Sequence, residues 1–156
     1  MASVHDVAKY ILAKRGSMST WKLQKLIYYS QAWHLVWRDE PLFSDPIEAW
    51  ANGPVVRALY DGHRGRFSID DWNLGDANAL GGGEQKSVDA VLAAYGDLSG
   101  RQLSFLTHSE TPWREARGDL EPTARSDAEI TQSSMQAFYS ALDTAENATP
   151  VAEIDW

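Results

Sequence analysis

Residues 21–37 read WKLQKLIYYSQAWHLVW, and this stretch decides the fold. No proline or glycine interrupts it, and its apolar side chains recur at helical spacing around most of the circumference. A helix that is apolar nearly all round belongs in the middle of a bundle. One side carries Leu23, Leu26, Ile27, Trp33 and Trp37, and the rest of the surface carries Tyr28, Tyr29, Ala32, Leu35 and Val36.

Further helices are predicted on both sides of this segment. Ser3 can cap a first helix that ends at Gly16, and helical periodicity returns over residues 88–98, 103–106 and 135–142. Thr111 and the proline after it predict a short helix as far as Arg117. The fold class is therefore mainly α: a single-domain helical bundle that can include a short two-stranded β element.

The β element is expected around residues 47–50, where apolar and polar side chains alternate briefly. Residues 67–69 are a possible pairing partner for it. Asn52, Gly53 and Pro54 punctuate the chain, and Pro54 suits the first turn of a helix with Val55, Val56, Leu59 and Tyr60. Residues 61–83 are rich in glycine and aspartate, which indicates a long surface loop.

Length and composition set the class of protein. The chain has 156 residues, of which 44% are hydrophobic, and no cysteine, so disulfide scaffolds, thiol nucleophiles and zinc–thiolate sites are excluded. No stretch is apolar enough for a membrane anchor, and no secretory signal is recognisable, so we expect a cytoplasmic protein. We expect one domain over residues 1–146 and a partly disordered tail over 147–156.

Charge is distributed unevenly along the chain. Residues 1–78 carry nine Lys and Arg against nine Asp and Glu, whereas residues 79–156 carry five against thirteen. The first 25 residues form a local basic cluster on a protein of net charge −8. This asymmetry favours a protein partner over nucleic acid, although a solvated charged face has the same pattern.

Three ordered blocks carry a resemblance to a known family. They are KLQKLIYYSQAW (22–33) continuing to PLF (41–43), EAWANGPVV (48–56) continuing to LY (59–60), and LSFLTHSETPW (103–113) ending in AR (116–117). Together they resemble the Panacea antitoxin domain, a SocA-like family, from about residue 7 to about residue 142. The motif residues, which we expect to be structural, are Leu23, Gln24, Leu26, Tyr28, Trp33, Trp50, Gly53, Pro54, Val55, Leu59, Tyr60, Thr107, His108, Pro112 and Trp113.

The resemblance implies an antitoxin that neutralises a cognate toxin, encoded by an adjacent gene, through direct contact. It leaves two mechanisms open, sequestration of the toxin and delivery of the toxin to a ClpXP-type protease. The resemblance also implies no enzymatic activity and no cofactor. Because the core starts near residue 1, we expect the stand-alone form of the domain.

The toxin-binding surface is predicted at the first two helices. Trp and Arg dominate interface hot spots, and charge complementarity steers association. The predicted contact residues are Lys14, Arg15, Trp21, Lys22, Lys25 and Tyr29, although the helical spacing of Tyr29 is also typical of a core position.

Two other functions remain open from the residues alone. A helix, a three-residue link and a second helix that starts near Lys22 have the lengths of a helix-turn-helix DNA reader. His108 and Glu110 could serve a hydrolase, although no nucleophile motif or phosphate loop accompanies them. His63, with Asp61 beside it, and His108 are a weak signal for metal, and we predict no metal site.

Overall fold

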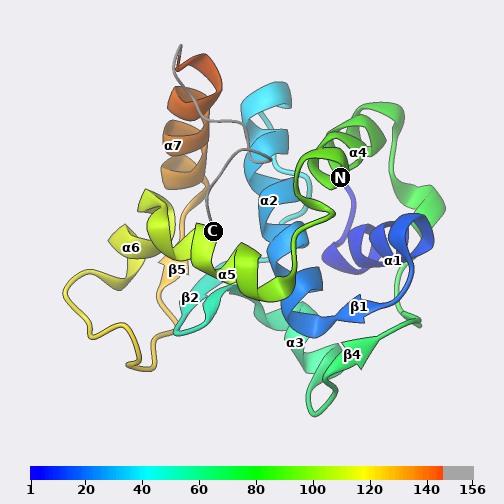
Figure 1. Ribbon diagram of the computed structural model, residues 1–156. Coiled ribbons are helices and arrows are strands. Elements are labelled where there is room, and N and C mark those ends of the chain that lie inside the picture. The colour runs from blue at the N-terminus through cyan, green and yellow to red at the C-terminus, as the bar shows by residue number, and fades with distance from the viewer. Residues whose placement is uncertain (146–156) are drawn as a thin grey trace.

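The computed structural model describes residues 1–145, and this part of the chain is mainly helical (Figure 1). Seven α-helices, one 3₁₀ turn and five short strands lie within it. The helices are α1 (Val4–Arg15), α2 (Thr20–Arg38), α3 (Arg57–His63), α4 (Gly82–Tyr95), α5 (Gly100–Ser109), α6 (Thr111–Arg117) and α7 (Gln132–Thr144), with η1 (Ala77–Ala79) before α4. The strands are β1 (Met18–Ser19), β2 (Ile47–Trp50), β3 (Gly53–Val56), β4 (Ser68–Ile69) and β5 (Glu129–Ile130).

Helix α2 lies at the centre of the molecule, as its all-round apolar sequence predicts. It packs against α4, α5 and α7 and also contacts α1 and β3 (Figure 1). Ser19 caps its start by accepting a hydrogen bond from the backbone N–H of Lys22, and Asp39 ends it in a left-handed conformation with φ of 56°. Every residue from Leu23 to Leu35 is buried, so burial on all faces holds this helix in place.

Two buried glutamines of α2 fasten the connections around it. The side-chain oxygen of Gln31 accepts a hydrogen bond from the backbone N–H of Leu42 at 2.7 Å, and its nitrogen donates to the carbonyl of Phe43 at 2.8 Å. Gln24 bonds both the N–H and the carbonyl of Val56, at 2.9 and 3.3 Å. These bonds satisfy backbone groups that would otherwise be buried without partners.

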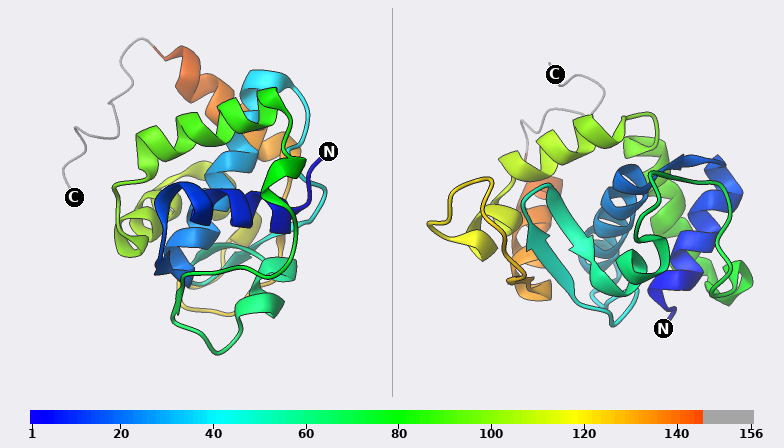
Figure 2. Two further views of the ribbon diagram at one scale, coloured as in Figure 1. Left: turned by 90° about the vertical axis from the view of Figure 1, so that its right-hand side faces the viewer. Right: turned by 90° about the horizontal axis from the view of Figure 1, so that it is seen from below.

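The strands form two small antiparallel sheets in the described residues. One has the order β3-β2-β5, and its β2–β3 hairpin faces the viewer in the right panel of Figure 2, where the molecule is seen from below. The other joins β1 to β4. The fold class is confirmed, and β2 lies where the alternating pattern predicted a strand.

Two local predictions in this region were wrong. Pro54 does not begin a helix: it lies in β3 opposite Ala49, and α3 begins only at Arg57. Residues 67–69 do not pair with β2, because Ile69 pairs with Met18 of β1 instead. The partners of Ile47 are Val56 on one side and Ile130 on the other, so long-range pairing overrode the local turn signals.

The predicted tail, residues 147–156, and the boundary at 146 lie outside the described residues. In residues 1–145 no helix has both the length and the hydropathy needed to cross a membrane.

Candidate functional site

The basic surface predicted at α1 and α2 is present in part. Trp21 keeps 45% of its surface exposed at the start of α2, and Lys14 and Arg15 are exposed at the end of α1. Lys22 is half-buried beside them. Arg15 is already engaged, because it donates to the Asp97 carboxylate at 3.1 Å and to the Leu92 carbonyl at 2.6 Å.

Two residues predicted for this surface lie inside the protein. Lys25 is 2% exposed and Tyr29 is fully buried, so neither shares the exposed face of Trp21. The prediction rested on charge and aromatic character along α2, whereas neighbouring elements bury this helix from Leu23 to Leu35.

Tyr29 belongs to a buried cluster around Glu110. The Glu110 carboxylate accepts hydrogen bonds from the hydroxyls of Tyr29 at 2.6 Å and Tyr139 at 2.9 Å, and Tyr28 bonds Tyr139 at 3.1 Å. Burial raises the pKa of Glu110 to about 7, although the two tyrosine hydrogen bonds act in the opposite direction. The cluster ties α2, α7 and the α5–α6 junction together.

The hydrolase interpretation needs His108 and Glu110 to work together, and their surroundings differ. Glu110 faces the tyrosines, whereas the His108 ring stacks on Trp113 with centroids 4.1 Å apart. The buried Nε2 of His108 has no hydrogen-bond partner among the described residues. Burial lowers the pKa of His108, with Lys25 and Arg117 as further positive neighbours. The geometry thus assigns His108 to packing.

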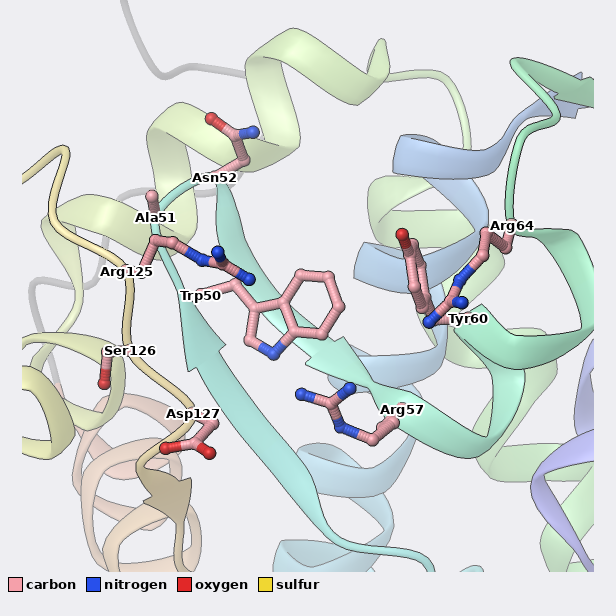
Figure 3. Close-up of a pocket in the computed structure, with 9 residues that line it drawn as sticks. All are labelled: Trp50, Ala51, Asn52, Arg57, Tyr60, Arg64, Arg125, Ser126 and Asp127. Carbon is pink, nitrogen blue, oxygen red and sulfur yellow. The ribbon is translucent and has the colours of Figure 1, made fainter.

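Another site emerges at the end of the β2–β3 hairpin, where three arginines converge on two aromatic rings (Figure 3). We call it the arginine groove, a cavity of about 510 Å³. Arg57 and Arg64 come from the two ends of α3, and Arg125 comes from the loop before β5. The lining residues are Trp50, Ala51, Asn52, Arg57, Tyr60, Arg64, Arg125, Ser126 and Asp127.

Cation–π contacts order two of these arginines. The guanidinium of Arg57 lies 5.2 Å from the ring centre of Trp50, and that of Arg64 lies 5.4 Å from the ring centre of Tyr60. Arg57 also makes a two-point contact with the Glu48 carboxylate at 3.1 and 3.2 Å. The two rings meet edge to face at 4.8 Å, which makes them a common floor for the groove.

A second, smaller cavity adjoins the groove, and we call it the Lys25 pocket. Its volume is about 230 Å³, and it shares Trp50, Asn52 and Tyr60 with the arginine groove. Trp21 and Arg66 lie at its edge. Burial alone lowers the pKa of Lys25 to about 7. Its other lining residues are Thr20, Gln24, Val55, His63 and Gly65.

Gly53 makes room for the Lys25 side chain. A Cβ on Gly53 would lie 2.5 Å from Lys25 Cε and 3.1 Å from Thr107 Oγ1. Gly53 also has φ of +119°, a conformation that side chains rarely adopt. The glycine therefore sets both the hairpin turn and the position of the lysine.

We predict that Gly53→Ala lowers the free energy of unfolding by about 1–3 kcal/mol, because the new methyl group is strained and displaces Lys25. Urea unfolding measures the change, and Gly82→Ala is the matched control, because a Cβ on Gly82 meets nothing within 4 Å. Equal stabilities of the two variants would contradict the role assigned to Gly53.

The sequence did not predict the arginine groove, because the arginines that line it are far apart along the chain. Arg57, Arg64 and Arg125 share no motif and no helical face, and only the pairing of β2 with both β3 and β5 brings them together. Trp50 and Tyr60 were singled out, but for structural roles. The aromatic character of Trp50 and Tyr60, whose rings are half-buried in the structure, was the one signal for this site that the sequence offered.

The remaining motif residues lie mostly in the interior of the described chain. Trp113 donates from its ring nitrogen to the Trp50 carbonyl at 2.8 Å, and Pro112 lies in the first turn of α6. Gln24 holds β3 as described above. The buried motif residues are Leu23, Leu26, Tyr28, Trp33, Pro54, Val55, Leu59 and Thr107.

The arrangement does not favour the helix-turn-helix alternative. In that alternative α2 would enter a major groove, which requires a free face, yet α2 is covered from Leu23 to Leu35. Among residues 1–145, no group of three or more His, Asp or Glu side chains could hold a metal ion.

The fold and these surfaces define a small helical domain with an exposed tryptophan and an arginine-lined groove, features that suit contact with another molecule. A family model described as "Antitoxin SocA-like, Panacea domain" matches residues 23–114, which is more than half of the chain. The chain belongs to this family, as the three sequence blocks predicted. A search of curated proteins and of solved structures finds no match. Membership of an antitoxin-like family suggests a protein that acts without catalysis.

Proposed function

We propose that this chain is the antitoxin of a toxin–antitoxin pair and neutralises its toxin in the cytoplasm by direct protein–protein binding. The observation that carries the proposal is the family match over residues 23–114. The exposed Trp21 beside basic side chains supports it, because aromatic anchors next to charges are typical of interface hot spots.

Co-expression with the product of the adjacent gene tests this proposal. We expect the chain to restore growth that the neighbour alone arrests, and to co-purify with it. Rescue with a stable complex identifies sequestration, whereas rescue with loss of the toxin that depends on a ClpXP-type protease identifies delivery for proteolysis. A neighbour that is harmless alone and never co-purifies contradicts the proposal for that pair.

The contact surface that we propose comprises Trp21, Lys22, Lys14 and Arg15. We predict that Trp21→Ala combined with Lys22→Glu weakens toxin binding at least tenfold, because an anchor is lost and a charge is reversed. Calorimetry or surface plasmon resonance with the purified toxin measures the loss. Lys86→Glu, on the exposed face of α4, is the matched control and should bind as the wild type does. Unchanged affinity in the double variant would place the interface elsewhere.

A further inference from the structure

The arginine groove gathers positive charge on a protein whose net charge is −8. Within residues 1–145 the salt bridges are Arg15–Asp97 and Arg57–Glu48, so Arg64 and Arg125 have no carboxylate partner there. Both side chains are exposed, and both line the cavity. Asp127 is the only acidic residue that lines it among the described residues. The groove therefore has an excess of positive charge.

The Lys25 pocket extends this positive character inward. Lys25 is buried, has no ion pair among the described residues, and lines the pocket that shares Trp50, Asn52 and Tyr60 with the groove. The titratable groups near Lys25 are His63 from α3 and His108 from α5, and Arg66 lines the same pocket. None of these neighbours is a carboxylate, so a buried cation here lacks a compensating charge among residues 1–145.

The chemistry that complements both cavities is the carboxylate. Guanidinium groups present paired N–H donors that match the two oxygens of a carboxylate, and the aromatic floor suits the methylene stem of a glutamate. Because the net charge of the protein is −8, an acidic partner is attracted only to basic surfaces such as this one. With a volume of about 510 Å³, the groove has room for more than one side chain of a partner.

We propose that the arginine groove docks an acidic segment of the partner toxin, with carboxylates on Arg64 and Arg125 and one carboxylate reaching Lys25. This inference rests on the proposed antitoxin function and gives the partner a chemical character. Trp21 borders the Lys25 pocket, so the groove and the basic surface at α1 and α2 form one continuous contact region.

A peptide experiment tests the groove without the toxin. A labelled hexaglutamate peptide, blocked at both ends, is titrated with the full chain, and hexaglutamine serves as the neutral comparison. We expect hexaglutamate alone to bind, with affinity that falls as salt rises, and Arg64→Gln with Arg125→Gln to weaken it at least tenfold. The matched control, Lys9→Gln with Lys86→Gln, removes two positive charges outside the groove and should leave affinity unchanged.

Three outcomes overturn the proposal. One is equal loss of affinity in the groove variant and in the control, and another is equal binding of the two peptides. The third is a short oligothymidine that binds through the same arginines while hexaglutamate does not, which would make the groove a nucleic-acid site.

The role of Lys25 has its own readout. A carboxylate that reaches Lys25 favours its charged form, so binding at pH 8 should take up protons, measured by calorimetry in buffers of different ionisation enthalpy. Lys25→Met should abolish the uptake. The histidines do not mimic this signal, because burial lowers the pKa of both His63 and His108. Binding without uptake in the wild type refutes the contact with Lys25.

Growth rescue separates this inference from the function on which it rests. If the wild type and the arginine double variant rescue cells equally well, with equal toxin affinity, the groove is not the docking site but the antitoxin function stands. If the wild type itself fails to rescue, the antitoxin function fails. Loss of rescue and of toxin affinity in the arginine double variant alone is the result that we expect.

Discussion

Lys25→Met is expected to raise the free energy of unfolding at pH 6 by up to about 5 kcal/mol. The lysine is 2% exposed, and burial lowers its pKa from 10.5 to about 7. Each unit of pKa shift corresponds to about 1.36 kcal/mol. The folded protein is therefore destabilised by up to about 5 kcal/mol when Lys25 is protonated. Methionine has a similar shape and no charge, so it fills the space without the penalty.

The stability gained by Lys25→Met should decrease as the pH rises. A lowered pKa means that the unfolded chain binds more protons than the folded one between about pH 7 and 10.5, so stability due to Lys25 rises over that window. This contribution of Lys25 to the free energy of unfolding is fully present above pH 10.5 and is lost as the pH falls through 7. The advantage of Lys25→Met should therefore shrink to about 1 kcal/mol at pH 10.

Glu110 changes the stability of the wild type in the opposite sense. Its pKa is raised from 4.5 to about 7, so its contribution is fully present below pH 4.5 and is lost as the pH rises through 7. The contribution is common to the wild type and to Lys25→Met, so it cancels in their difference. Urea unfolding of both proteins from pH 6 to pH 10 isolates the lysine.

Lys86→Met is the control, because Lys86 is exposed and its replacement should alter stability by less than about 0.5 kcal/mol at each pH. A difference between Lys25→Met and the wild type that does not vary with pH would show that the folded protein does not resist charging Lys25. A stability loss at pH 6 would show that the charged lysine has a stabilising partner.

How much of the fold could be predicted is clearest at α2. Periodicity placed this helix at the centre, because an apolar surface on all sides has only one stable location. The same helix misled the site prediction. Lys25, the sixth residue of α2, was expected to be exposed because it is charged, and only the close approach of Gly53 shows how it can be buried.

The arginine groove illustrates what a sequence does not encode locally. Pro54 carried a helix-start signal because the proline ring fixes φ at a value that helices also use, yet pairing with Ala49 made it part of a strand. That strand directs the chain into α3 and so places Arg57 and Arg64. The positions of these arginines depend on strand pairing between distant segments, and the sequence holds no short-range signal for such pairing.

Arg117→Met is expected to lower the free energy of unfolding by about 3–5 kcal/mol, because several backbone carbonyls lose a charged donor and each buried group left unpaired costs about 1–3 kcal/mol. Arg117 is 5% exposed and donates to four backbone carbonyls. The bond to Ala49 in β2 measures 2.9 Å, and that to Ala124 in the following loop measures 2.6 Å. Its guanidinium also lies 5.0 Å from the ring centre of Trp113. One side chain thus fastens the loop to the sheet.

The loss should spread to the arginine groove, because the fastened loop carries Arg125. We expect hydrogen exchange to quicken over residues 121–128 more than in α2, and hexaglutamate affinity to fall together with it. Arg114→Met, an exposed position on the same helix, is the control and should change neither. Arg117→Lys keeps the charge but has fewer donors, so an intermediate loss is expected.

Rapid exchange throughout the chain, or unchanged exchange in the loop, would contradict the role of Arg117 as the anchor of this loop. Selective exchange in the loop with full hexaglutamate affinity would instead show that Arg64 holds the carboxylates without Arg125.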